Sequence, residues 1–489
     1  MSITTPRPKV LGERSTRLSF RSVLGYGAGD AANNLAFSLA TTFLLLYYTD
    51  VVGLPAAAIG TMFLIVRLWD AFADLLAGRL VDRTMTRWGK FRPFILFGSI
   101  PLLVMSMLTF AVPQGWSSGA QLLYAYLSYA VLGLIYSTVN VPYGSLATAM
   151  TQASRERAKL AVARGVGAGL AGLLLTFIIS PQIQTISKNK TLSAADRASQ
   201  LQSVFFQTTL LFVVVGFGLY FLTFRLCREV VVRVEPRVSI KDTFKTLRTN
   251  KPLGILCASS FFYLIGTFAV GGSTAYYAIY VLGNASFIIW ITLATLIVGF
   301  VLAPFVPGLV TRFGKKNLYQ YCGLFTVIGG VAVFFVPGDQ PLLALLCIAV
   351  KGVGISLINT LMFALEADTV EYGEWKTGHR SEGASYAIFS FTRKITQSLG
   401  GALGAFALAA GSYVTKLAAG QVQPDSAIIA IKASLGLVPA VAAILAMLCF
   451  IKYPLTEKRY ANMVSETETR KAELLQQENV ARVPIPPVL

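Results

Sequence analysis

Residues 67–92 read RLWDAFADLLAGRLVDRTMTRWGKFR, and they place three charged residues inside an apolar run. Arg67, Asp70 and Asp74 are three and four positions apart, so a helix carries all three on one face. Two carboxylates four positions apart repel each other weakly on a helix. The run then ends in the basic turn TRWGKFR. Both features need an explanation from the surroundings of this helix.

The composition of the chain identifies those surroundings. Of its 489 residues, 55% are hydrophobic and 13% are charged, whereas a soluble chain carries charge at roughly a quarter of its positions. Apolar stretches of about 20 residues, each long enough to cross a bilayer as a helix, recur along the chain. The sequence therefore predicts an all-α integral membrane protein.

The apolar stretches number twelve, and the basic linker 227–252 separates them into two groups of six. We expect an N-terminal bundle with a basic cytoplasmic tail (1–226), a C-terminal bundle (253–453) and a loosely ordered cytoplasmic tail (454–489). The expected spans are 22–49, 57–81, 93–112, 121–149, 160–180, 202–226, 253–281, 287–310, 317–336, 341–367, 383–411 and 427–453.

The basic residues behind the net charge of +19 are distributed unevenly between the loops on the two sides of the membrane. Loops 50–56, 113–120, 282–286 and 337–340 contain no Lys or Arg. The basic residues of the opposite side are Arg7, Lys9, Arg14, Arg17, Arg21, Arg83, Arg87, Lys90, Arg92, Arg155, Arg157, Lys159, Arg312, Lys315 and Lys316. By the positive-inside rule both termini face the cytoplasm. This asymmetry explains the charge without a nucleic-acid partner.

A sequence motif that occurs once in each half indicates that the two halves are related. The second span runs into GRLVDRTMTRWGKFRP (78–93), and the eighth runs into PGLVTRFGKKN (307–317). Each copy places Gly, a short apolar step, Arg and then Gly-Lys at an expected cytoplasmic turn. Such repeats are typical of secondary transporters, whose binding site lies near the midplane between the halves.

The acidic pair favours ion coupling. Charged groups at bilayer depth are costly and normally face a cavity or a partner. Asp70 and Asp74 therefore call for a cation or a proton, and burial favours the protonated form of a carboxylate. The alternative is a structural salt bridge in which Arg67 only neutralises Asp70, and that alternative leaves Asp74 unexplained.

Further polar residues interrupt other spans, and several have a plain structural explanation. Asp30 favours a structural or gating role near the cytoplasmic surface, and Arg164 can be read as a loop residue. Lys351 can extend to the outer face, and Arg393 can pair with Glu366 or a lipid phosphate. The polar residues singled out within spans are Asp30, Asn33, Asn34, Asn140, Arg164, Lys351, Arg393 and Lys394.

The stretch EADTVEYGEWKTGHRSEG (366–383) gathers acids and bases between the tenth and eleventh spans. One histidine, His379, with scattered acids is a poor match to the ligand sets that metals prefer. We expect ion pairs that close the cytoplasmic side instead. The five cysteines form no CxxC pair and are interpreted as packing residues.

Taken together, these motifs resemble the glycoside–pentoside–hexuronide:cation symporters, a branch of the major facilitator superfamily. The resemblance rests on YYTDVVGL (47–54), RLWDAFAD (67–74), TRWGKFRPF (86–94), NVPYGSLATAMTQ (140–152), EADTVEYGE (366–374) and FSFTRK (389–394). The details AANN, YGSLATAMTQ and ALEADTVEYGE look closest to the bacterial glucuronide carriers of that family. It implies a major facilitator fold and uptake of a sugar or glycoside by alternating access.

The resemblance also implies roles for residues, carried over position by position. The cation site comprises Asp70, Asp74 and Ser137; the substrate site comprises Asn34, Asn140, Arg164, Ser390 and Lys394; the cytoplasmic gate comprises Asp82, Arg83, Glu371, Glu374 and Arg380.

Departures from the family pattern bear on substrate and ion. In the melibiose-carrier branch the positions of Asn34 and Asn140 are aspartates, so the amides here remove repulsion against an anionic ligand and still bind hydroxyls. A tryptophan of that branch is Gly144 here, which leaves room for a larger ligand. Sodium-using members often carry asparagine at Ala73, which has no oxygen for a cation that needs several. We therefore expect protons to be the coupling ion.

The expected function is uptake of glucuronides or related glycosides by a monomeric carrier in the bacterial inner membrane. Its partners are an anionic sugar, a coupling cation (H⁺, or else Na⁺) and the lipid bilayer, with no nucleic acid and no other cofactor. A sodium-coupled carrier of neutral glycosides or pentosides is the alternative, followed by a lipid transporter and a non-transporting sugar sensor. The sequence shows no nucleophile–base set, so an enzyme is not expected.

Overall fold

The computed structural model describes residues 17–151, 153–189, 191–230, 248–378, 382–417 and 421–481. Within these ranges the chain is helical apart from its turns and one isolated bridge between Thr86 and Gly89. The helices of the first half are α1 (Phe20–Leu46) with the π-helical η1 (Tyr47–Val52), α2 (Ala56–Arg83), α3 (Arg92–Thr109), α4 (Ser118–Met150), α5 (Ser154–Lys188) and α6 (Ala194–Leu226).

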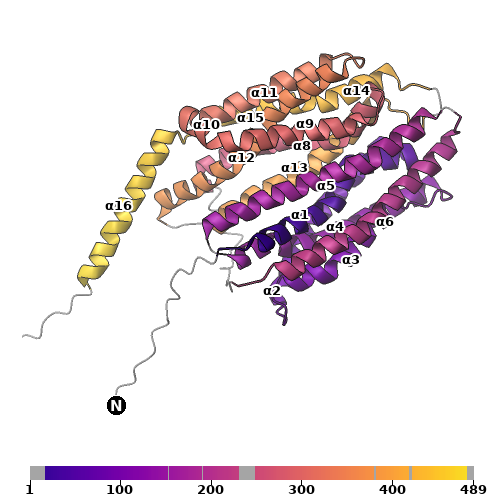
Figure 1. Ribbon diagram of the computed structural model, residues 1–489. Coiled ribbons are helices and arrows are strands. Elements are labelled where there is room, and N and C mark those ends of the chain that lie inside the picture. The colour runs from indigo at the N-terminus through magenta and orange to yellow at the C-terminus, as the bar shows by residue number, and fades with distance from the viewer. Residues whose placement is uncertain are drawn as a thin grey trace, which may run out of the picture.

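The second half repeats this scheme. Its helices are α8 (Lys251–Tyr276) with the π-helical η2 (Tyr277–Val281), α9 (Phe287–Leu302) continuing through η3 (Ala303–Phe305) into α10 (Val306–Phe313), α11 (Lys315–Phe335), α12 (Pro341–Thr377), α13 (Glu382–Ala410), and α14 (Asp425–Leu435) followed by α15 (Leu437–Ile451). A charged helix, α16 (Glu457–Ala481), projects from one end of the helical body (Figure 1).

Eleven of these helices, within the described ranges, are long and apolar enough to cross a membrane. They match eleven of the twelve expected spans, some as composites such as α14 with α15. The remaining expected span, the eleventh at 383–411, corresponds to α13, which is less apolar and holds Arg393 and Lys394 in its middle. The side chains that α13 contributes are those expected at a transport site.

The helices pack mainly within each half and meet along three seams. In the first half α1 packs against α5 and α6, and α4 packs against α2 and α3. In the second, α8 packs against α13 and α15, and α11 packs against α12 and α15. The seams join α2 to α13, α1 to α8 and α5 to α9 (Figure 1). The domain boundaries at 226 and 252 remain predictions, because residues 231–247 lie outside the described part of the chain.

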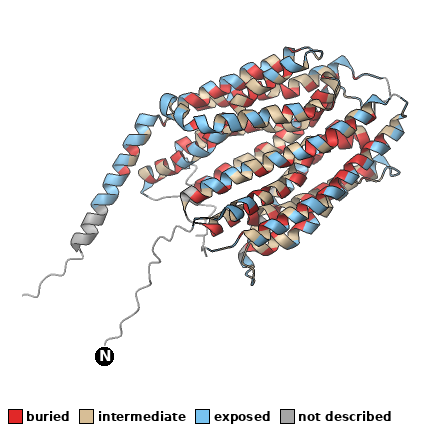
Figure 2. Cartoon of the chain, viewed as in Figure 1, coloured by how far each residue is buried: buried red, intermediate tan, exposed pale blue. Residues whose placement is uncertain are grey.

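The distribution of burial is that of a protein surrounded by lipid. Exposed positions recur along the outer faces of the helices (Figure 2), and α9 exposes Trp290, Ile297, Phe300 and Val301. A large apolar outer surface is unfavourable in water and suits the hydrocarbon core of a bilayer.

The two copies of the Gly-Lys turn share one local structure. Gly89 and Gly314 both have a positive φ, +107° and +73°, which glycine adopts without steric cost. The carboxylate of Glu229 accepts hydrogen bonds from the backbone N–H groups of Lys90, Phe91 and Arg92 at 2.8, 2.8 and 3.0 Å. A carboxylate here stabilises the N-terminus of α3, where backbone N–H groups lack helical partners.

In the second half Glu457 takes the equivalent position. Its Oε1 accepts the backbone N–H of Lys315 at 3.0 Å, at the start of α11. The repeated motif is therefore also a structural repeat. In each half, an acidic residue that follows the last span caps the N-terminus of the third span, Glu229 for α3 and Glu457 for α11. We call the end of the molecule with these turns and α16 the basic end, and the other the far end.

Replacing Glu229 by alanine is expected to lower the melting temperature more than replacing Glu457. Glu229 satisfies three backbone donors and Glu457 one, and each lost charge-assisted bond costs roughly 1–3 kcal/mol. Thermal unfolding of both variants in the same detergent checks this. An equal or smaller shift for Glu229→Ala would contradict the capping role.

The C-terminal tail departs from the loose order that we expected. In α16, Glu466 accepts the indole N–H of Trp375 at 2.8 Å, and Lys471 pairs with Glu374 at 2.6 Å. Met463 is buried. The helix is therefore attached to the end of α12. Its apolar and semi-polar positions at Tyr460, Met463, Val464 and Thr467 follow helical spacing, a signal that the charged composition of the tail obscures.

Candidate functional site

The acidic pair of α2 lies where α2 meets α4 and α13. Arg67 donates through Nη1 to Asp70 Oδ2 at 3.2 Å, and both side chains are 18% exposed. The guanidinium also lies 5.8 Å from the ring centroids of Phe37 and Tyr129. The pairing considered in the sequence analysis is therefore present, and it uses one of the two carboxylate oxygens of Asp70.

The other oxygen, Asp70 Oδ1, is buried and has no hydrogen-bond partner among the described residues. It points at Gly133 of α4 so closely that a Cβ on that glycine would collide with it. Ser137, which is buried, lies one turn further along α4 and therefore on the same face as Gly133. A buried acceptor without a donor is unfavourable, so this oxygen is suited to a proton or a small cation.

Asp74, one turn beyond Asp70, pairs with Lys394 through its Oδ2. Lys394 lies on α13, so this ion pair joins the two halves. The lysine side chain is 44% exposed and the carboxylate 20%. The structure thus brings together the acid of the second span and the base of the eleventh span.

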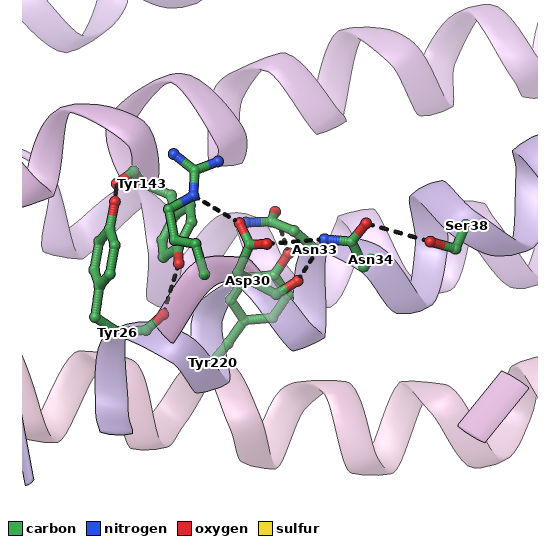
Figure 3. A network of polar contacts seen from close by, with 8 residues as sticks. Tyr26, Asp30, Asn33, Asn34, Ser38, Tyr143 and Tyr220 are labelled. Carbon is green, nitrogen blue, oxygen red and sulfur yellow. Dashed lines mark hydrogen bonds and ion pairs between the residues drawn. The ribbon is translucent and has the colours of Figure 1, made fainter. Parts of the chain in front are cut away.

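A second polar network lies in the first half, between α1, α4, α5 and α6 (Figure 3). Asp30 accepts the Nε–H of Arg164 at 3.0 Å through Oδ1 and the amide of Asn34 at 3.1 Å through Oδ2. Asn34 Oδ1 in turn accepts the hydroxyl of Ser38 at 3.2 Å. Asp30 is buried. Arg164 lies within α5 (Ser154–Lys188), so the interpretation of Arg164 as a loop residue was wrong.

Aromatic residues fix the rest of this network. Tyr143 donates to the backbone oxygen of Tyr26 at 2.6 Å, and their rings stack at 4.8 Å. Tyr220 donates to Asn33 Oδ1 at 2.7 Å. Gly144, next to Tyr143, has no atom within 4 Å of the place where a Cβ would lie. The open space expected at this glycine is present.

The remaining predicted substrate residues, Asn140 and Ser390, lie on helices of different halves. Asn140 is half-buried on α4, one turn before Gly144, and Ser390 is half-buried on α13, one turn before Lys394. Of these two helices, α13 meets α2 at a seam between the halves, whereas α4 packs mainly against α2 and α3 within the first half. Arg393 lies with its guanidinium carbon 4.9 Å from the ring centroid of Phe363.

Three of the predicted gate residues, Arg83, Glu371 and Glu374, lie at the basic end. Arg83 is exposed at the end of α2, and Glu371 is half-buried on α12. Glu374 pairs with Lys471 of α16. The side chain of Asp82 and all of Arg380, like His379, lie outside the described part of the structure.

A cluster at the far end was not predicted. Asp50 accepts hydrogen bonds from the hydroxyls of Thr49, Tyr280 and Tyr413 at 2.8, 2.5 and 2.7 Å. Thr49 and Tyr276 share a hydroxyl hydrogen bond of 2.7 Å. We call these five residues the far-end cluster; they join η1 of one half to η2 and the end of α13 of the other. The sequence signal was an acid beside two tyrosines in YYTD, quoted for resemblance only.

Lys351 also differs from its plain interpretation. Its side chain does not extend to a membrane face: the residue is 2% exposed and Nζ donates to the backbone oxygen of Leu435 at 2.7 Å. Leu435 is the last residue of α14, immediately before the break at Gly436. The ammonium group therefore satisfies a carbonyl that the helix break leaves without its intrahelical partner.

Two halves of membrane helices around charged and amide side chains define a multi-pass transporter with the major facilitator fold, and not an enzyme. The crystal structure of a D-xylose–proton symporter has this fold, with a TM-score of 0.60 at 14% identity over 89% of this chain and 98% of that one. This chain belongs to the family described as MFS/sugar transport protein, whose model matches residues 25–457.

Relatives in sequence agree with that family. A glucuronide carrier protein homolog of Escherichia coli is 45% identical over 93% of this chain and 97% of its own. An isoprimeverose transporter of Lactiplantibacillus pentosus is 32% identical over 92% and 91%. The resemblance to the cation symporters of glycosides and hexuronides is therefore confirmed, and the protein is a multi-pass inner-membrane transporter of the sugar symport type.

Proposed function

We propose that this protein takes up glucuronides or related anionic glycosides by alternating access, driven by a proton gradient. The observation that carries the proposal is the acidic pair of α2, where one buried oxygen of Asp70 has no donor among the described residues and Asp74 is held by a base of the other half. A charge arrangement that spans both halves can link ion binding to their relative movement.

The coupling step follows from the ion pair. While Asp74 is ionised it holds Lys394, and the seam between α2 and α13 stays closed. Protonation of the acidic pair removes the charge that binds the lysine, so Lys394 is released toward the substrate. The same exchange with a bound cation is possible in principle, but Ala73 between the two acids is fully buried and supplies no oxygen. These residues support H⁺ over Na⁺.

The anionic substrate is supported by the second network. Among the described residues, Asp30 is the one carboxylate that pairs with Arg164, and it does so through Nε; Asn140 offers an amide, and Gly144 leaves space. The glucuronide carrier homolog is the relative that points in the same direction. The alternative is a sodium-coupled carrier of neutral glycosides, and the similarity to an isoprimeverose transporter supports it.

The orientation and state follow from charge and contacts. The basic end faces the cytoplasm under the positive-inside rule, and both termini therefore lie there. With α13 crossing the membrane as well, the spans number twelve. The far-end cluster joins the halves on the outside, and Gln184 adds a contact by accepting the backbone N–H of Ala285 at 2.6 Å. This arrangement corresponds to a carrier closed to the outside, with the acids of α12 and Arg83 forming the inner gate. We propose that the carrier acts as a monomer.

Counterflow in proteoliposomes tests the substrate class. Vesicles loaded with unlabelled 4-nitrophenyl β-D-glucuronide are expected to take up the labelled form, whereas loading with the matching xyloside or glucoside gives much weaker exchange. Equal or stronger exchange with the neutral glycosides would favour the alternative.

A further inference from the structure

Arg164 uses only part of its guanidinium. Its Nε donates to Asp30 Oδ1 at 3.0 Å, and the hydroxyl of Tyr26 also interacts with the guanidinium. A guanidinium has two edges that fit a carboxylate, and among the described residues no carboxylate pairs with the edge formed by Nη1 and Nη2. The side chain of Arg164 is 42% exposed, so this edge is accessible.

Asp30, in contrast, is fixed on all sides. Its side chain is 8% exposed. One oxygen accepts from Arg164 and the other from Asn34, whose amide also donates to the backbone oxygen of Asp30 at 2.9 Å. The amide oxygen of Asn34 is engaged by Ser38. The hydrogen-bonding groups of Asn34 are therefore committed to holding Asp30.

The ring of Tyr143 supports the guanidinium from one face. Its centroid lies 5.4 Å from the guanidinium carbon of Arg164, within the range of a cation–π contact. Tyr143 is itself held by its bond to Tyr26 and by ring stacking. The contacts with Asp30 and with the ring of Tyr143 together set the orientation of Arg164. The open space at Gly144 lies beside that ring.

We propose that Asp30 is a positioning residue that sets selectivity for anionic substrates. It holds Arg164 by Nε, so that Nη1 and Nη2 are presented side by side to the carboxylate of the ligand. The inference rests on the proposed function, because it assigns a residue to recognition of the uronate group. Asp30 acts through Arg164 and does not touch the substrate itself.

A double-mutant cycle tests this role with two ligands that differ at one group. The probes are 4-nitrophenyl β-D-glucuronide and 4-nitrophenyl β-D-glucoside, and the readout is the ratio of their Kd values in detergent. Asp30→Ala is expected to weaken the glucuronide by about tenfold and the glucoside by less than about threefold, because a bidentate charge-assisted contact is lost. Asp30→Asn keeps an acceptor for Nε, so its glucuronide affinity falls less than that of Asp30→Ala.

The cycle separates positioning from a structural role. Arg164→Lys removes the paired nitrogens, and Asp30→Ala added to it is expected to change the ratio no further. Ser145→Ala serves as the matched control, since its hydroxyl donates only to the backbone of α4. Equal losses for both ligands, or additive effects in the double variant, would overturn the inference. If Asp30→Ala does not fold, Asp30→Leu carries the test, because leucine fills a similar space without an acceptor for Nε, and an unchanged ratio there would also overturn the inference.

The wild-type protein distinguishes this inference from the proposed function. If it binds the glucoside as tightly as the glucuronide, the proposed substrate class is wrong. If it prefers the glucuronide and the Asp30 variants keep that preference, the substrate class stands and the role of Asp30 is wrong.

Discussion

Asp70→Asn is expected to abolish uphill accumulation of substrate while counterflow continues. The amide matches the carboxylate in shape, and it cannot take up a proton or carry the charge that a cation needs. The buried Oδ1 of Asp70, which lacks a donor, is the place where the coupling ion is expected. Reconstituted vesicles with an imposed gradient check this, since the variant should only equalise the inner and outer concentrations.

Asp74→Asn is expected to behave in the same way, and it also removes the partner of Lys394. Asp425→Asn is the matched control, because Asp425 is exposed at the first residue of α14, away from the acidic pair. The control should accumulate substrate like the wild type. Uphill accumulation by both α2 variants would mean that coupling resides elsewhere.

Gly133→Ala is expected to reduce coupled uptake as severely as Asp70→Asn, although it changes no charge. A Cβ at Gly133 would lie against Asp70 Oδ1 and fill the place assigned to the ion. Gly119→Ala is its control on the same helix, because Gly119 is exposed near the start of α4 and the added methyl group meets no atom within 4 Å there. Sodium-free uptake under a pH gradient compares the two variants.

The outcome for Gly133 locates the ion site independently of charge. If Gly133→Ala retains coupled uptake at the level of Gly119→Ala, the space next to Asp70 is not the ion site. A fall in both uptake and counterflow, with a lower melting temperature, would show that the helices α2 and α4 have separated and that the packing, not the ion, was disturbed.

Much of the fold can be predicted from the sequence, because every segment that crosses a bilayer must be a helix of mostly apolar residues. Eleven spans follow from runs of apolar residues, and the Gly-Lys turns at Gly89 and Gly314 follow from the repeated motif. Helix α13, which the sequence also predicted as a span at 383–411, is less apolar than the other eleven because it carries Arg393 and Lys394.

The acidic pair and the bases that contact it were predicted, whereas the pair of Asp30 and Arg164 was not. Helical spacing put Asp70 and Asp74 on one face, and the resemblance named Lys394, but the contact between Asp74 and Lys394 depends on how α2 meets α13. Likewise the pair of Asp30 and Arg164 requires α1 to lie against α5, with 134 positions between the two residues. Local patterns contain no information on such distances.

The far-end cluster was missed for a related reason. Asp50 stands in a motif at the end of a span, where an acid is unremarkable. Its partners Tyr280 and Tyr413 come from the other half, and the π-helical turns η1 and η2 that align them have no sequence signature. Only the assembled halves show that this carboxylate closes one end.

The central claim is that the acidic pair of α2 moves protons together with an anionic glycoside. Its most direct test is proton movement caused by substrate alone, in sodium-free proteoliposomes with a pH indicator inside. Adding 4-nitrophenyl β-D-glucuronide outside should acidify the interior in wild type and leave it unchanged in Asp70→Asn. Substrate entry without acidification, or entry that requires sodium, would contradict the account.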